Sequence, residues 1–214
     1  MEAWARELPG RPVADGVCFI DRFLPRKQCA QILQELQFAL WRPSLTYQRQ
    51  PDGTYRNVLT AHRVSNTAHE DWFSDQLKEI LKRIERQLRG RFGVDPDYLE
   101  PWQATDYCRN GKFDYHLDAG YWEGHYAGDR VLTFLLYLTT PLKGGGTHFR
   151  ALDKLVRART GRLLVWRNLF ANGGCDGRVI HSATPLLRGR KTTLVTWQRQ
   201  GKYRNTEQGL LGNR

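Results

Sequence analysis

Apolar residues recur at helical spacing in two stretches of the first half of the chain. The first stretch follows Pro25, a residue suited to the first turn of a helix. The second runs from about Glu70 to Arg89, with basic residues opposite its apolar positions, and Gly90 is predicted to end it. Their apolar faces consist of Cys29, Ile32, Leu33, Leu36 and Leu40 in the first helix and of Phe73, Leu77, Ile80, Leu81, Ile84 and Leu88 in the second.

From Tyr98 onward the pattern changes to short apolar runs separated by glycine-rich turns, which is typical of β-strands. Pro51-Asp52-Gly53 is a turn signature between two earlier expected strands. Helices followed by evenly spaced strands predict an α+β protein whose sheet closes into a sandwich or barrel, with the helices packed on one sheet. Trp166 and Trp197 are expected in the core. The expected strands are Gln103–Cys108, Phe113–Asp118, Val131–Leu138, Gly146–Phe149, Arg162–Trp166, Arg178–Ser182 and Thr192–Arg199.

The 214 residues contain no repeat and no Pro/Gly/Ser linker, so we expect one domain over residues 1–214, helical to about residue 97 with a β-core over about residues 98–200. Hydrophobic residues make up 40% and charged residues 26%, the balance of a globular protein. The longest apolar run, Val131–Leu138, is too short to span a membrane. Four scattered cysteines and a charged N-terminus without an export signal predict a reduced, cytoplasmic protein with no membrane association.

The formal net charge is +11, from 33 Lys plus Arg against 22 Asp plus Glu. Such an excess can indicate a nucleic-acid partner or an acidic substrate. The basic residues are spread along the chain, however, and neither an RNA-binding aromatic motif nor zinc-finger spacing is present. We therefore expect the charge to solvate the protein surface, and nucleic acid is a disfavoured partner.

The main chemical signal is the segment His116-Leu117-Asp118. Residues two apart on a strand point to the same face, so an imidazole and a carboxylate would project together, as they do in the two-His, one-carboxylate iron(II) site. Such a site needs a third ligand from a distant strand. His181 lies in an apolar strand, and the next antiparallel strand would bring Lys191 beside it, where the ammonium group could pair with a keto-acid carboxylate. Alternatively, His181 is a hydrogen-bonded core residue and Lys191 is a surface charge.

Further motifs resemble the prolyl 4-hydroxylase-like branch of the 2-oxoglutarate and iron(II) oxygenases, over about residues 17–200. Tyr107 and Phe113 stand where that family has two tyrosines, and Phe23-Leu24 and Arg63-Val64-Ser65 look like its N-terminal pieces. Its GGxTxF and H-x3-P-x3-G-x-K-x5-W patterns match Gly144, Gly145, Thr147 and Phe149, and then His181, Pro185, Gly189, Lys191 and Trp197. The departures from the pattern, which leave the three metal ligands and the lysine unchanged, are Gly111, Arg150 and Leu186.

The resemblance implies a double-stranded β-helix (jelly-roll or cupin-like) barrel. It implies Fe(II) bound by His116, Asp118 and His181, with 2-oxoglutarate and O₂ as co-substrates and ascorbate as a reductant. Lys191 would bind the far carboxylate of 2-oxoglutarate, and the hydroxyls of Tyr107 and Thr147 would assist it. Halogenating relatives have a small residue at the position of Asp118, so hydroxylation is favoured over halogenation, and no catalytic residue is expected beyond the metal centre.

The implied reaction is hydroxylation of an unactivated C–H bond in a prolyl residue of a peptide or in a related small molecule. A free amino-acid or natural-product hydroxylase is the main alternative. A nucleic-acid demethylase is disfavoured because such enzymes have two arginines after the distal histidine, and a non-enzymatic binding barrel is disfavoured because all three ligands are present. Arg63, Tyr121 and Trp122 are candidate substrate contacts, and the polar segment Arg49–Asn57 is a candidate lid. The sequence indicates no oligomeric state.

Overall fold

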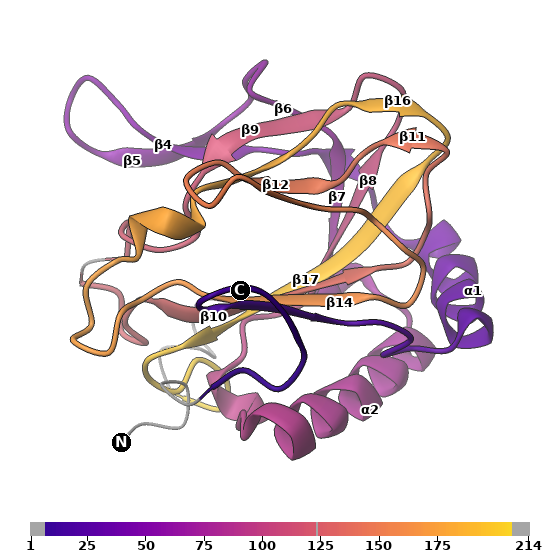
Figure 1. Cartoon of the computed structure of the whole chain (residues 1–214), viewed down its shortest axis with the longest axis horizontal. Helices are drawn as coiled ribbons and strands as arrows, with labels where there is room; N and C mark the ends of the chain where they lie inside the picture. The colour runs from indigo at the N-terminus through magenta and orange to yellow at the C-terminus, as the bar shows by residue number, and fades with distance from the viewer. Residues whose placement is uncertain (1–6, 123, 207–214) are drawn as a thin grey trace.

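The larger of two antiparallel sheets lies between the helices and a smaller sheet (Figure 1). The computed structural model describes residues 7–122 and 124–206. The order of strands in the larger sheet is β1 (Arg11–Ala14), β2 (Val17–Ile20), β14 (Leu163–Arg167), β10 (Arg130–Tyr137), β17 (Lys191–Arg199), β8 (Gln103–Tyr107), β7 (Asn66–His69) and β3 (Arg42–Pro43).

The smaller sheet lies on the side of the larger one that faces away from the helices (Figure 1). Its strand order is β13 (Lys154–Val156), β12 (Thr147–Phe149), β15 (His181–Ala183), β9 (Lys112–His116) and β6 (Arg63–Val64). Two strand pairs belong to neither sheet, namely β11 (Lys143–Gly144) with β16 (Leu186–Arg188) and the hairpin of β4 (Thr46–Arg49) with β5 (Tyr55–Val58). Two facing sheets with helices on one side agree with the predicted α+β arrangement.

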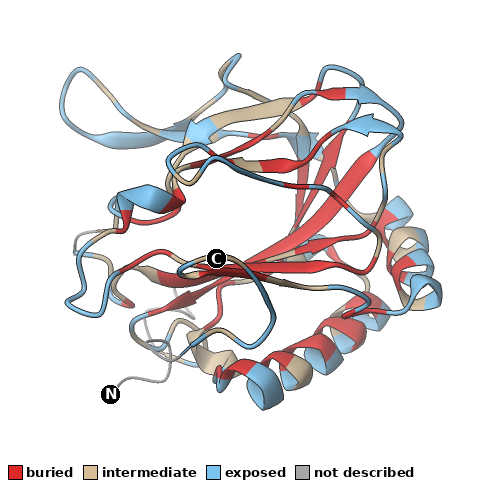
Figure 2. Ribbon diagram, viewed as in Figure 1, coloured by how far each residue is buried: buried red, intermediate tan, exposed pale blue. Residues whose placement is uncertain are grey.

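The central strand β17 is buried along its whole length, and Figure 2 shows the same for most of the larger sheet. Side chains alternate between the two faces of a strand. Leu194 therefore packs into the core that includes the helices, whereas Lys191, Thr193 and Val195 line a pocket on the opposite face. Both faces of β17 are covered, so its polar residues are buried as well as its apolar ones.

The helices are α1 (Arg26–Glu35) and α2 (Asp75–Phe92). The predicted bounds of the second helix were wrong at both ends. The Ser74 hydroxyl accepts a hydrogen bond from the Leu77 amide and caps the helix, which leaves residues 70–72 in a separate 3₁₀ turn. Gly90 lies inside α2, and Gly93, with a φ of 69°, ends it. Within residues 7–122 and 124–206, no helix is both long and apolar enough to cross a membrane.

The first 97 residues are less helical than predicted, because β1, β2 and β7 join the larger sheet and β6 joins the smaller one. The Pro51-Asp52-Gly53 turn does separate two strands, β4 and β5, as expected. The predicted strand over residues 178–182 begins only at His181. The Asp176 carboxylate accepts a hydrogen bond from the Arg178 amide, and this cap starts a 3₁₀ turn instead of a strand.

Candidate metal centre

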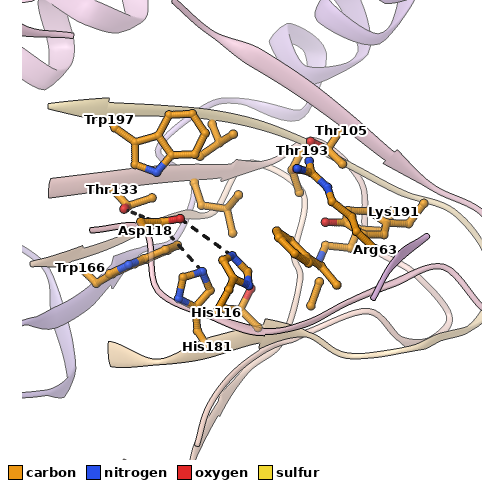
Figure 3. Close-up of a pocket in the computed structure, with 16 residues that line it drawn as sticks. Arg63, Thr105, His116, Asp118, Thr133, Trp166, His181, Lys191, Thr193 and Trp197 are labelled. Carbon is orange, nitrogen blue, oxygen red and sulfur yellow. Dashed lines mark hydrogen bonds and ion pairs between the residues drawn. The ribbon is translucent and has the colours of Figure 1, made fainter. Parts of the chain in front are cut away.

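A pocket lies between the facing sheets and contains the predicted metal and co-substrate residues (Figure 3). Strands β8, β10, β14 and β17 contribute one wall, and β6, β9, β12 and β15 contribute the other. Of the candidate substrate contacts, Arg63 lines the pocket, whereas Tyr121 and Trp122 lie outside its lining. The lining residues are Arg63, Thr105, Tyr107, Phe113, His116, Asp118, Thr133, Leu135, Thr147, Trp166, His181, Ala183, Lys191, Thr193, Val195 and Trp197.

His116 and His181 are directly opposite each other on the paired strands β9 and β15, and their ring centres lie 4.3 Å apart. The Nδ1 atom of His116 lies 2.8 Å from the Asp114 carbonyl oxygen, and that of His181 lies 3.0 Å from the Val179 carbonyl oxygen. A carbonyl oxygen can only accept, so each Nδ1 carries the proton. Each Nε2 is then a free donor of electrons to a metal.

Asp118 lies two residues beyond the end of β9, not on the strand as predicted, yet its carboxylate still faces both histidines. Its Oδ1 lies 3.9 Å from Nε2 of His116, and its Oδ2 lies 3.9 Å from Nε2 of His181. The Thr133 hydroxyl donates to Oδ2 at 2.7 Å and in turn accepts a hydrogen bond from the Asn168 amide at 2.9 Å. This chain of hydrogen bonds fixes the orientation of the carboxylate.

The surroundings of these three side chains prepare them for a cation. Burial, reinforced by the neighbouring His181, lowers the pKa of His116 to about 3, and burial also lowers the pKa of His181. Burial acts to raise the pKa of Asp118, but electrostatic interaction with His181, His116 and Arg130, with the Thr133 hydrogen bond, holds it below its ordinary value. At neutral pH the site therefore has two neutral imidazoles and one carboxylate, the protonation states that metal ligands require.

The geometry fits a divalent transition metal. The three ligand atoms lie within 4.8 Å of one another in a pocket between the sheets. Two ligands with bonds of about 2.1 Å can be no more than about 4.2 Å apart. Both histidine-to-carboxylate distances meet this limit, and the three atoms need to draw together by no more than about 0.6 Å to bind one ion. Two imidazoles and one carboxylate that leave the remaining directions open are the donor set of non-haem iron(II) oxygenases.

Lys191 begins β17 in the larger sheet, so it is not on the strand next to His181, as the sequence had suggested, but reaches into the pocket from the opposite wall. Its side chain is 2% exposed, and burial lowers its pKa to about 7. Its Nζ lies 4.7 Å from the centre of the Tyr107 ring. Among residues 7–122 and 124–206, no carboxylate lies within ion-pair distance of it. A buried ammonium group without a carboxylate is suited to binding an anionic ligand.

Tyr107 and Thr147 lie in the same pocket as Lys191. Tyr107 is the cross-strand partner of Lys191, and burial raises the pKa of its phenol, so the hydroxyl keeps its proton and can donate it. The Thr147 hydroxyl lies 2.6 Å from the hydroxyl of Tyr137, a buried residue that was not predicted from the sequence. The hydroxyls of Tyr107 and Thr147 would therefore lie near a ligand bound by Lys191.

Arg63 is a second cation in the pocket. Its guanidinium donates to the Leu45 carbonyl oxygen at 3.1 Å and to the Thr67 hydroxyl at 3.2 Å, and it lies 4.7 Å from the Phe113 ring centre. Phe113 in turn stacks on the metal-site His116, with ring centres 3.7 Å apart. Arg63 is thus held by neutral groups, and its charge is available to a ligand in the pocket.

Sequence reasoning missed several residues of the pocket wall, of which three carry polar groups near the metal ligands. Thr133 had no recognised role, and Trp166 and Trp197 were expected only in the core. Both indoles are buried, and their Nε1 atoms have no hydrogen-bond partner among the described residues. They are donors inside a pocket that also contains the metal ligands. The only signal in the sequence was the position of Trp197 in the terminal motif.

Comparisons with known proteins agree with this geometry. Residues 102–199 match the 2OG-Fe(II) oxygenase superfamily. The chain is 30% identical over 165 residues to prolyl 4-hydroxylase subunit alpha-1 of Gallus gallus, a match that covers 74% of this chain and 31% of that protein. A match to prolyl 4-hydroxylase subunit alpha-2 of Caenorhabditis elegans is also 30% identical and covers 64% of this chain and 26% of the relative. The chain thus spans less than a third of the length of these curated relatives.

Solved structures share the fold. A prolyl-4-hydroxylase from Pseudomonas putida superposes with a TM-score of 0.60 at 19% identity, covering 86% of this chain and 92% of that one. A viral collagen prolyl hydroxylase from Paramecium Bursaria Chlorella virus-1, in complex with 2OG, superposes with a TM-score of 0.59 at 17% identity, covering 88% and 99%. The predicted double-stranded β-helix fold is therefore confirmed. Through residues 102–199 the chain belongs to the 2OG-Fe(II) oxygenase superfamily, which uses Fe(II), 2-oxoglutarate and O₂.

Proposed function

We propose that this chain is an Fe(II)- and 2-oxoglutarate-dependent dioxygenase that hydroxylates a prolyl residue of a peptide. The observation that carries the proposal is one pocket with two complementary ends. His116, Asp118 and His181 converge at one end, and Lys191, a buried cation without a carboxylate partner, lies at the other. A ligand that chelates a metal at one end and carries a carboxylate at the other matches both.

The three converging side chains would hold iron(II). When bound with 2-oxoglutarate and O₂, iron supplies oxidative decarboxylation to succinate and CO₂, coupled to hydroxylation of an unactivated C–H bond. The chain's own part is to bind, orient and exclude water. Lys191 would pair with the far carboxylate of 2-oxoglutarate, and the hydroxyls of Tyr107 and Thr147 would donate hydrogen bonds to it.

Several observations support a peptide substrate. The curated relatives are prolyl 4-hydroxylase subunits, and one solved neighbour is a prolyl hydroxylase from Trichoplax adhaerens in complex with a hypoxia inducible factor peptide fragment. Tyr121 is 38% exposed, which suits a contact outside the lined pocket. Tyr47 and Tyr55 of the β4–β5 hairpin contact Trp122 and Tyr121, so the Arg49–Asn57 segment, with the rest of this hairpin, would act as a lid over a bound substrate.

Arg63 favours a second candidate, a free amino-acid or natural-product hydroxylase of the same chemistry. Its guanidinium lines the pocket and is held by neutral acceptors and an aromatic ring. It could therefore pair with the carboxylate of a small acidic substrate instead of a peptide carbonyl.

Substrate-dependent succinate formation separates the two candidates. The full chain is loaded with iron(II) without oxygen, supplied with 2-oxoglutarate and ascorbate, and offered proline-containing peptides, the same peptides with 4-hydroxyproline, and free amino acids. We expect succinate in proportion to peptide hydroxylation and only background turnover with the hydroxylated peptides. Succinate driven only by free amino acids would favour the second candidate, and background turnover with every compound would contradict both. His116→Ala is the matched inactive control.

Three further features of the proposal concern the protein's setting. Ascorbate would serve as the reductant that keeps the iron in its Fe(II) state. The four cysteines are free thiols, which supports a cytoplasmic location. Residues 7–206 of the predicted domain over 1–214 would form one dioxygenase domain, since the N-terminal strands β1, β2 and β7 are integral to the larger sheet; its residues 1–6, 123 and 207–214 lie outside the described residues.

A further inference from the structure

Trp122 lies in a stack of rings that runs from the β4–β5 hairpin to the pocket wall. Tyr47 of β4 lies parallel to the Trp122 indole, with ring centres 5.4 Å apart and planes at 2°. The guanidinium groups of Arg130 and Arg199 also contact the indole, at 4.6 Å and 4.2 Å from its centre. The indole thus contacts both a hairpin residue and two cations of the larger sheet.

The base of this stack is rigid. Arg130 donates two hydrogen bonds to the Glu100 carboxylate, at 2.6 and 2.7 Å, and lies 3.7 Å from the ring centre of Trp197, which lines the pocket. Arg199 is 1% exposed and donates to the Gly128 carbonyl oxygen at 2.7 Å. Because these hydrogen bonds fix both guanidinium groups, the groups restrict the position of the Trp122 indole that packs on them.

Trp122 also contacts the backbone of a metal ligand. Its Nε1 donates a hydrogen bond to the carbonyl oxygen of Asp118 at 3.1 Å. Asp118 lies beyond the end of β9, so no strand pairing fixes its backbone. The indole N–H therefore supplies a restraint on this residue that the sheet does not.

The hairpin, in contrast, has few attachments. β4 and β5 pair with each other and with neither sheet, and a two-stranded hairpin is marginally stable alone. Its contacts with the rest of the molecule include Tyr47 on Trp122, Tyr55 on Tyr121 and a long hydrogen bond of 3.4 Å between Thr46 and Thr60. The parallel stack on Trp122 joins the hairpin to a residue that bonds the Asp118 backbone, so the position of the hairpin is linked to this contact.

We propose that Trp122 is a positioning residue that couples the position of the β4–β5 hairpin to the metal ligand Asp118. Packing of Tyr47 holds the indole in the orientation that bonds Asp118, and an ordered Asp118 binds the metal more tightly. Coupling between two sites is reciprocal, so metal binding must stabilise the packed hairpin by the same factor. The proposal rests on the metal site proposed above and gives Trp122 a role other than substrate contact.

The first test is metal affinity, measured without turnover. The full chain binds Co(II) in competition with a chromogenic chelator. Trp122→Phe keeps a ring but loses the N–H, and Tyr47→Leu removes the stack from the hairpin side. Each should weaken cobalt binding about tenfold, the lower end of the range for residues that orient a ligand. Tyr47→Phe keeps the stack and should bind as the wild type does. Trp72→Leu, at an exposed tryptophan outside the site, is the matched control and should change affinity less than about twofold.

The second test uses the reciprocity. Cobalt should slow hydrogen exchange of the β4 and β5 amides in the wild-type chain, and in Trp122→Leu cobalt should still bind but no longer slow this exchange. Equal slowing in Trp122→Leu, or none in a wild-type chain that binds cobalt, would overturn the coupling and leave the metal site intact. A wild-type chain that binds no metal would overturn the metal site and this proposal with it.

Discussion

Replacing Lys191 by methionine should stabilise the protein and at the same time weaken its binding of 2-oxoglutarate. The lysine side chain is 2% exposed, and its pKa falls from 10.5 to about 7 in the folded chain. Between these values the unfolded chain binds more protons than the folded one, so this group's contribution to stability rises with pH. At pH 7 a pKa that is lower by about 3.5 costs about 4 kcal/mol of folding free energy. Lys191→Met should recover up to about this amount at pH 7 and less towards pH 10.

The effect on the co-substrate has the opposite sign. Loss of a buried charge-assisted pair should cost about 2–4 kcal/mol of 2-oxoglutarate affinity. Only the ammonium form attracts a carboxylate, so wild-type affinity should fall about tenfold from pH 6 to pH 8, and this slope should disappear in Lys191→Met. Lys191→Arg should rescue binding only in part, because the guanidinium fork has a different geometry.

Two measurements on the same variants check both signs: urea unfolding between pH 6 and pH 10, and calorimetric titration of 2-oxoglutarate into the metal-loaded chain. An unchanged 2-oxoglutarate affinity in Lys191→Met, or a pH slope that persists in this variant, would refute the assignment. Arg190 and Arg199 would not be the substitutes, since Arg190 pairs with Asp106 and Arg199 with Glu100. Arg63, which lines the same pocket, would be the remaining cation to test.

Alanine at His116, Asp118 or His181 should abolish retention of one iron(II) per chain after anaerobic loading and desalting. A variant that keeps its iron and full turnover would show that the replaced residue is not a metal ligand. Thr133→Val removes the hydroxyl that donates to Asp118 and should weaken iron binding about tenfold in chelator competition, and an unchanged affinity would show that this hydrogen bond does not orient the carboxylate. Oligonucleotide binding should vanish near physiological salt, and methylated DNA or RNA should drive no succinate above background; turnover on either would move the function to nucleic-acid demethylation.

The sequence predicted the clustering of His116, Asp118 and His181 better than it predicted their surroundings, because the spacing of His116 and Asp118 is local. Side chains two residues apart on an extended chain point to the same face. Asp118 therefore faces His116 although it lies beyond the end of the strand. Helix α2 was recognised from its apolar spacing, but its ends depend on single contacts. The Ser74 cap begins the helix, and the left-handed conformation of Gly93 ends it. The sequence alone does not distinguish Gly90, which lies inside the helix, from Gly93.

Long-range pairing was not readable in the same way. Lys191 was expected beside His181, but a turn through β16 carries the chain to the opposite sheet, where Lys191 pairs with Tyr107. No local period encodes which sheet a strand joins. Strands β14 and β17 are covered on both faces, so Trp166 and Trp197 looked like core residues although one face of each strand lines the pocket.

The charges in the pocket suggest why metal and co-substrate should bind together. Asp118 and protonated Lys191 contribute one charge of each sign at opposite ends, where no ion pair joins them. A divalent cation alone would leave a net charge of about +2, and the dianion of 2-oxoglutarate would cancel it, so each ligand lowers the electrostatic cost of burying the other. Arg63 then remains as one positive charge held by neutral groups. That charge would favour substrates that present a carboxylate or several carbonyl oxygens at this wall of the pocket, so proline compounds with free and with amidated carboxyl groups should differ in affinity, and Arg63→Gln should remove the difference.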